Sequence, residues 1–319
     1  MTRLSTLVLL LLATGLVGCD TTATQSESQI VVEAYLEGGA PLPPIRLTRS
    51  VDTDEAYTAA DDAVRFATVE VLRLTADGAT AATTPYVETD PGVYRPAPTP
   101  IPVVQPLTTY ELSVTVPEET RVTATTTVPD TISIVEAQNV VVPYQSPQKP
   151  TFTITAPQSD RDGQAVLVLT TKSLLEFRRP EPELRQGLTP FYEDAYDPAE
   201  DSIDTFRTTS SGVLNEASFS RDPNGRITTE LPWISVAFYG PNESAVHVID
   251  DNFYDFIRSQ QAQSTGGPGG GGLGPGEIPN VIEHVEGGTG VFASYVRDAQ
   301  NVFIQCLPSQ DECPSYVTQ

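Results

Sequence analysis

Alternating apolar and polar positions dominate the first part of the chain. Residues 30–37 place four apolar side chains on one face of a strand, with Glu33 and Glu37 on the other. Further short segments of this kind follow at intervals of roughly 10 to 15 residues, separated by turns rich in Gly, Pro and Asp. They cover residues 45–48, 68–74, 92–94, 107–114 and 121–128. This pattern predicts an antiparallel β-sandwich over residues 30–130.

One tyrosine suggests which kind of sandwich this is. Tyr110 stands three residues after Leu107 and opens an alternating strand. This arrangement resembles the corner of immunoglobulin-like and fibronectin-like sandwiches. We therefore expect an immunoglobulin/fibronectin-like fold for this part of the chain.

After a proline-rich linker over residues 131–150, residues 151–319 predict a second antiparallel β domain. Strands are expected at 151–156, 164–171, 212–219, 226–230 and 233–239, followed by one or two strands from 287 to 306. Residues 165–169 are apolar on both faces, which predicts a central strand. One helix is predicted near 250–263, capped by Asp250 or Asp251, and we expect it to cover the second sheet. Phe253, Phe256, Ile257 and Gln260 share one face of this helix.

Two segments show no regular pattern. Residues 178–205 are rich in Pro, Glu and Asp and are too long for an ordinary connection. Loops of this length are usually either functional or disordered. Within them, Phe191, Tyr192 and Tyr196 are the candidates for contact with a glycan or a partner protein. The alternative is a solvated acidic loop whose aromatic rings fold onto the domain. Residues 266–276 are nearly all glycine and predict a mobile loop.

The N-terminus has the features of a bacterial secretion signal over residues 1–18. Arg3 precedes an apolar run, and small residues lead to Cys19. The sequence Leu-Val-Gly-Cys at 16–19 resembles the lipobox of bacterial lipoproteins, which implies that Cys19 is lipidated and becomes the mature N-terminus. An ordinary signal peptide with an incidental cysteine is the alternative, and the apolar run is shorter than the roughly 20 residues that span a bilayer. Residues 19–29 then form a polar tether.

The net charge limits the kinds of partner that the protein can bind, and the cysteines bear on the disulfide expected after export. The net charge of −24 excludes nucleic acid as a natural partner and disfavours anionic lipid. Acidic residues spread along the whole chain resemble the composition of proteins from salt-adapted organisms. Cys306 and Cys313 have six residues between them, and export to an oxidising compartment predicts a disulfide between them.

The sequence supplies little catalytic chemistry, and we predict no enzyme activity, metal or cofactor. The two histidines do not form a zinc motif, and no Gly-x-Ser-x-Gly elbow is present. His247 lies among Val246, Val248 and Ile249, as a structural strand residue does. Residues 160–163 and 222–225 match only the middle of a calcium loop and are better interpreted as turns. Glycoside hydrolysis by a pair of carboxylates stays an alternative, but the sequence does not indicate which of its 42 acidic residues would form the pair.

Several segments together resemble the DUF4249 lipoproteins, which are uncharacterised proteins of Bacteroidota and their relatives. The resemblance rests on 30–36 soon after the lipobox, 45–50, 110–114, the late amphipathic helix and 287–293. Members of this family are often encoded beside TonB-dependent outer-membrane receptors. The resemblance therefore implies an accessory or binding lipoprotein, anchored to the outer membrane through three acyl chains and partnered with such a receptor. The alternatives are a surface glycan-binding or adhesion module and a carboxylate-based glycoside hydrolase.

Overall fold

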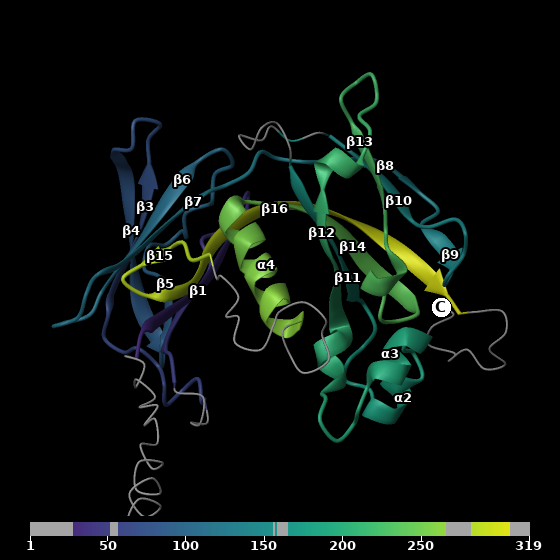
Figure 1. The fold of residues 1–319 in the computed structure, drawn as a ribbon, viewed down its shortest axis with the longest axis horizontal. Helices are drawn as coiled ribbons and strands as arrows, with labels where there is room; N and C mark the ends of the chain where they lie inside the picture. Colours follow the sequence, from purple (N-terminus) through teal and green to yellow (C-terminus); the bar gives the residue numbers. More distant parts are fainter. Residues whose placement is uncertain (1–27, 52–56, 156, 158–164, 266–281, 307–319) are drawn as a thin grey trace, which may run out of the picture.

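The computed structural model describes residues 28–51, 57–155, 157, 165–265 and 282–306 (Figure 1). The fold is mainly β, as predicted, with one large mixed sheet, a small three-stranded sheet and few helices. Within the described ranges, no helix is long and apolar enough to cross a membrane.

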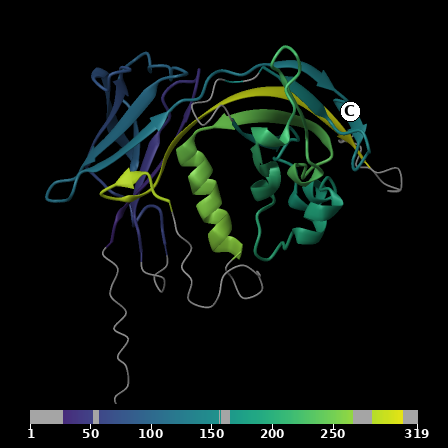
Figure 2. The ribbon, with the colours of Figure 1, turned by 45° about the horizontal axis from the view of Figure 1, so that its top comes forward.

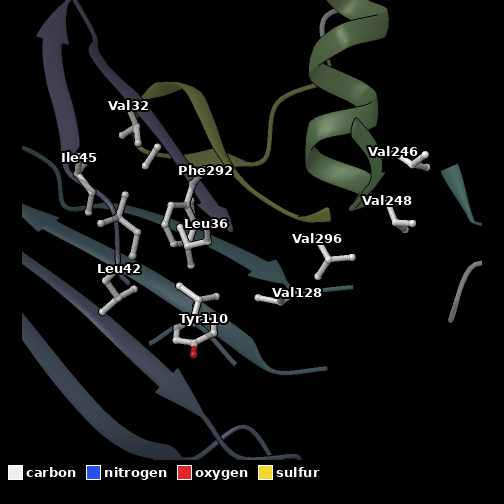
Figure 3. Close-up of a cluster of buried hydrophobic side chains, with 14 of the residues drawn as sticks. Val32, Leu36, Leu42, Ile45, Tyr110, Val128, Val246, Val248, Phe292 and Val296 are labelled. Carbon is white, nitrogen blue, oxygen red and sulfur yellow. The ribbon is translucent and has the colours of Figure 1, made fainter. Parts of the chain in front are cut away.

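The N-terminal strands are β1 (Ile30–Glu37), β2 (Ile45–Arg49), β3 (Thr68–Leu74), β4 (Thr80–Asp90), β5 (Val93–Pro96), β6 (Thr109–Thr115) and β7 (Val122–Thr127). They pair antiparallel in the order β1-β2-β5-β4-β3-β6-β7. The alternation seen in the sequence directs Val32 and Leu36 into a core that also contains Tyr110 (Figure 3). The Tyr110 hydroxyl accepts a hydrogen bond from the backbone N–H of Gln105 at 2.9 Å, five residues upstream, as expected for a tyrosine corner.

The remaining strands are β8 (Ile134–Gln138), β9 (Val141–Pro143), β10 (Thr151–Ile154), β11 (Val166–Ser173), β12 (Thr208–Asn215), β13 (Ile227–Glu230), β14 (Gly240–Ile249), β15 (Val285–Glu286) and β16 (Thr289–Gln305). The large sheet continues from β1 through β16, β14 and β11 to β12, with β9 beside β16 and β15 beside β7. The small sheet has the order β13-β10-β8. β11 is paired on both sides, which agrees with its apolar pattern.

Strand β16 joins the two parts of the molecule. It has 17 residues, runs parallel to β1 and antiparallel to β14, and crosses from the N-terminal strands to the far end of the fold (Figure 1). The predicted domains 30–130 and 151–319 thus share one sheet and one main hydrophobic core. The segment predicted as a linker, 131–150, contains β8 and β9.

The C-terminal part of the large sheet has two unlike faces. Val246 and Val248 point into the main core, which also holds Phe152 and Ile154 of the small sheet. On the opposite face, Val166, Val168 and Ile249 pack with residues of α4 (Asp251–Thr265). Figure 2 shows β14 and β16 arching over α4. The helix predicted at 250–263 is therefore present and covers the sheet.

Three local predictions differ from the structure. Residues 178–205 contain α2 (Glu181–Arg185), α3 (Pro190–Ala195) and the start of the 3₁₀ helix η1 (Ile203–Arg207), because Leu184, Tyr196 and Ile203 share a small core. The segment 233–239 begins as the 3₁₀ helix η3 (Trp233–Ser235), where Ser235 bonds back to the Pro232 carbonyl. The predicted strand 212–219 ends at Asn215, where the 3₁₀ helix η2 (Glu216–Ser218) follows, and β14 is not among the predicted strand ranges.

Candidate functional site

Strand alternation and register bring several rings to one face of the large sheet. In β1, Tyr35 lies on the face opposite the core residues Ala34 and Leu36. The register pairs Glu37 with Tyr295 of β16. On its other side, β16 pairs with β14, where Ile249 is the partner of Tyr295. His247 lies two residues from Ile249 in β14 and therefore on the same face. Residues more than 200 positions apart in the sequence therefore share this face.

Together with Phe253 of helix α4, this face forms an open cavity of about 290 Å³, which we call the aromatic cleft. Its lining residues are Tyr35, Val168, Thr170, His247, Ile249, Phe253 and Tyr295. The ring centroids of Tyr35 and Phe253 are 5.1 Å apart, and those of His247 and Tyr295 are 5.5 Å apart. Both pairs are tilted, so the rings form a wall around the space rather than a closed stack.

A second cavity of about 410 Å³ lies on the other side of Tyr35. Phe256, Ser259 and Gln260 of α4 line it, together with residues of β1 and the start of β16. Tyr35 belongs to the walls of both cavities. Each cavity approaches or reaches the usual volume of a small-molecule pocket.

His247 is the principal polar group of the aromatic cleft. Its Nε2 lies 2.8 Å from the Thr170 hydroxyl oxygen. Burial, helped by the nearby charge of Arg297, lowers the pKa of His247 to about 4, against the opposing effect of Glu243. The imidazole is therefore neutral at physiological pH. Among the described residues, the hydrogen bond to Thr170 is the one that the imidazole makes.

The charged groups near the cleft are engaged with protein partners. The Tyr295 hydroxyl donates to Glu37 at 3.0 Å, and Arg297 pairs with Glu243 at 2.5 Å. Burial raises the pKa of both Tyr35 and Tyr295 to about 12, with nearby glutamates acting in the same direction. The cleft wall consequently presents neutral rings and alkyl groups.

The N-terminus of α4 is fixed by a buried polar junction. Asp250 accepts hydrogen bonds from the backbone N–H groups of Phe253 and Ser294 and from the Thr126 hydroxyl. The Asn252 side chain donates to the backbone carbonyls of Thr125 and Phe292 at 2.7 and 2.9 Å. The junction thus ties the helix that covers the cleft to β7 and β16.

Replacing Asp250 by asparagine is expected to stabilise the protein at neutral pH. Burial, helped by the charge of Asp251, raises the pKa of Asp250 from 3.8 to about 6. The folded state therefore holds this proton more tightly than the unfolded chain, and the resulting stability is present below pH 3.8 and lost as the pH rises through 6. Asparagine keeps the acceptor without the charge, and the expected gain at pH 7.5 is on the order of 2 kcal/mol.

Urea unfolding of wild type and Asp250→Asn at pH 7.5 and pH 3.5 measures this difference. The gain should disappear at the lower pH, where wild-type Asp250 is also protonated. An Asp250→Asn protein that is less stable than wild type at pH 7.5 would show that the ionised carboxylate is favourable there.

The three residues predicted to contact a glycan or partner differ in their exposure to solvent. Phe191 is 52% exposed. Tyr192 packs against the small core and donates its hydroxyl to the Ile234 carbonyl at 2.6 Å. Tyr196 is buried in that core and donates its hydroxyl to Glu181. Their rings form an edge-on series with Phe206, which holds the short helices together.

The other candidate residues lie partly outside the described chain. Cys19, Cys313, the glycine-rich segment 266–276 and the near-calcium segment 160–163 fall there. Cys306 is disulfide-bonded, and its pairing with Cys313 stays a prediction. Asp222 is part of a turn, where its carboxylate accepts from the backbone N–H groups of Asn224 and Arg226. No cluster of metal-binding side chains occurs among the residues with described positions.

Sequence reasoning did not single out the aromatic cleft. The sequence pattern places Phe253 on the helix face and His247 on a strand, but neither Tyr35 nor Tyr295 is among the predicted site residues. A signal did exist for Tyr35, because it shares the outward face of its strand with Glu33 and Glu37. A ring on the outward face of a strand marks a site only together with other apolar side chains on that face, and those come from distant segments.

These features define a mainly β protein in which one long strand connects a curled N-terminal sheet to a sheet covered by a helix. The chain belongs to the family described as Domain of unknown function (DUF4249), whose model matches residues 19–301. This confirms the family resemblance seen in the sequence. No curated protein matches the chain.

Solved structures show only distant similarity. Salmonella alpha-2-macroglobulin reacted with methylamine is 11% identical with a TM-score of 0.23, and the match covers 86% of this chain and 15% of that one. Trypsin-activated Escherichia coli alpha-2-macroglobulin is 11% identical with a TM-score of 0.19, covering 70% and 14%. A tetra-tandem repeat from the extending region of a large adhesion protein is 11% identical with a TM-score of 0.21, covering 87% and 49%. These values support no argument about function.

Proposed function

We propose that this protein is a lipid-anchored binding protein of the bacterial outer membrane that holds a neutral, apolar, ring-bearing molecule in the aromatic cleft. The cavity of about 290 Å³ beneath α4 carries this proposal. Support for the anchor comes from the lipobox-like sequence ending at Cys19.

The chemistry of the cleft wall favours this ligand class. Rings and alkyl groups make up most of the wall, so apolar surface of a ligand is removed from water on binding. The neutral His247 offers a single hydrogen-bonding nitrogen for orientation. An anionic ligand would lose its hydration without gaining a free counter-charge, because Arg297 is already paired with Glu243.

The lipid anchor would confine the binding activity to the membrane surface. Family members are often encoded beside TonB-dependent receptors, and we propose that this chain serves such a receptor as an accessory protein. Confinement to one membrane raises the effective concentration of the two partners, so a weak interface between them is sufficient.

Titration with the neutral fluorescent probe N-phenyl-1-naphthylamine tests the cleft. The mature chain with Cys19→Ser is used, because it has no lipid that would compete for the probe. Phe253→Ala removes a ring from the cleft wall and should weaken binding about ten-fold, as expected for the loss of one aromatic contact worth roughly 1.4 kcal/mol.

Phe256→Ala is the matched control. Phe256 is also half-buried on α4, but it lines the second cavity instead of the aromatic cleft. Its replacement should change the affinity for this small probe little. Equal losses in both variants would show that the helix, rather than the cleft wall, determines binding. A wild-type chain that does not bind the probe would contradict the proposed ligand class.

The other candidate functions receive less support. A glycan-binding or adhesion surface at 191–204 needs ring faces open to a sugar, whereas Tyr192 and Tyr196 use their rings and hydroxyls inside the small core. A glycosidase needs two carboxylates facing a cleft. No carboxylate is among the described residues that line the aromatic cleft, and Glu37 and Glu243 are bonded to Tyr295 and Arg297.

A further inference from the structure

Phe66 is held in an unusual conformation that displays its ring to solvent. Its side chain is 79% exposed, and its φ of 59° lies in the left-handed region that bulky residues rarely adopt. The backbone N–H donates to Glu88 at 3.0 Å, and the same carboxylate accepts from Arg65 at 2.9 Å. The Arg65 guanidinium lies 5.0 Å from the ring centroid. These bonds hold the phenyl ring in an exposed position, although the left-handed backbone is costly and contact with water does not stabilise an apolar ring.

This ring lies at the end of the fold where the described chain begins. The Gln29 carbonyl accepts from the Ser50 backbone N–H at 2.9 Å. The adjacent Arg49 N–H donates to the Asp62 carbonyl at 2.7 Å. β3 begins two residues after Phe66 and pairs there with Thr115, at the end of β6. We call this end of the fold, formed by residues 28–30, 57–66 and 115–121, the entry end.

Chain length keeps the entry end close to the proposed anchor. Cys19 precedes Ser28 by nine residues. A fully extended segment of that length spans at most about 30 Å, so the entry end stays within that distance of the lipid surface. Tyr57, also part of the entry end, is 54% exposed and adds a second aromatic ring.

The charges of the entry end restrict the kind of surface that it can contact. Four acidic side chains lie there against two arginines, of which Arg65 is paired with Glu88 and Arg121 donates to the Ser113 hydroxyl. The acidic residues are Asp61, Asp62, Glu118 and Glu119. An anionic membrane would repel this surface, whereas a zwitterionic one would not.

We propose that Phe66 inserts into the interface of a zwitterionic membrane leaflet and orients the anchored protein with its entry end toward the lipid. This proposal rests on the lipid anchor of the proposed function. Phe66 and Tyr57 act as interfacial aromatic side chains, and the bonds to Glu88 hold the phenyl ring in its inserted position. The anchor supplies the attachment, and the ring supplies the orientation.

Depth-dependent fluorescence quenching tests this insertion in the full-length lipidated protein. Phe66→Trp is reconstituted in phosphatidylcholine vesicles whose acyl chains are brominated near the headgroup, and the emission of the single native Trp233 is subtracted. The added emission should fall about two-fold, because interfacial side chains reach the boundary between headgroups and acyl chains. Circular dichroism verifies that the variant is folded.

Leu107→Trp is a matched control at the opposite end of β6. Leu107 is also bulky, 59% exposed and left-handed, with a φ of 54°. Its tryptophan emission should not be quenched. Unquenched Phe66→Trp on a protein that floats with the vesicles would overturn the insertion and leave the anchor intact, and equal quenching of both variants would also overturn it. Lipidated protein that fails to float would overturn the anchor and this proposal together.

Discussion

Gly290→Ala should strongly destabilise the protein. Gly290 of β16 is paired with Val32 of β1, and it has a φ of +104°, which disfavours every side chain. A Cβ atom at this position would lie 2.2 Å from the Val32 carbonyl oxygen and 2.8 Å from the Val32 nitrogen. Backbone atoms of two paired strands cannot move apart without breaking the sheet. The backbone conformation costs about 1–2 kcal/mol and the steric clash typically 1–3 kcal/mol more, a large part of the stability of an ordinary domain.

Gly78→Ala distinguishes the cost of the backbone conformation from the cost of the steric clash. Gly78 has a φ of +80°, but nothing lies within 4 Å of a Cβ atom placed there. Its replacement should lower the free energy of unfolding only by the backbone term of about 1–2 kcal/mol. Urea unfolding, followed by circular dichroism, measures both variants. Equal losses at the two glycines would show that the approach of β1 to β16 tolerates an added carbon.

The sequence was informative where each strand has one buried face. In β1, the alternation of Ile30, Val32, Ala34 and Leu36 predicts which side chains enter the core, and they are all buried. Tyr110 similarly predicts a corner because its hydrogen bond is local in sequence. The amphipathic face of α4 is a local pattern as well. Such features depend on neighbouring residues alone.

Long-range pairing could not be predicted from the same patterns. The parallel pairing of Val32 with Gly290 joins segments that are separated by most of the chain, and alternation does not specify a partner strand. The aromatic cleft depends on this pairing, since Tyr35 meets Tyr295 and Phe253 only when β1 lies beside β16. The ordering of residues 178–205 also depends on distant contacts, such as those of Leu184 and Tyr196 with Phe238.

Functional expectations from local motifs had a similar limit. His247 was correctly placed on a strand, but its neutrality results from burial and from Arg297, which lies across the β14–β16 pair. Asp250 was predicted only as a cap, whereas its bonds to Thr126 and Ser294 connect three elements. In both cases the residue type was visible and the environment that determines its chemistry was not.

Cys19→Ser is expected to move the protein from the membrane to the soluble fraction. A thiolate is required for lipid attachment, and serine keeps the size of the side chain but not this chemistry. A single myristoyl chain gives only marginal membrane binding, whereas each buried CH₂ contributes about 0.8 kcal/mol, so three acyl chains make attachment effectively permanent. The change in location should therefore be nearly complete. Metabolic labelling with a fatty acid and fractionation of cells measure it.

The same substitution at Cys306 is the matched control, since it changes a cysteine near the other end of the chain. Cys306→Ser should retain the lipid label and the membrane location, although loss of its disulfide can lower stability. The contrast separates lipidation at position 19 from a general requirement for cysteine. If Cys19→Ser remained on the membrane without a lipid label, protein contacts alone would hold it there. The aromatic cleft and Phe66 would then have to act from a surface that another protein provides.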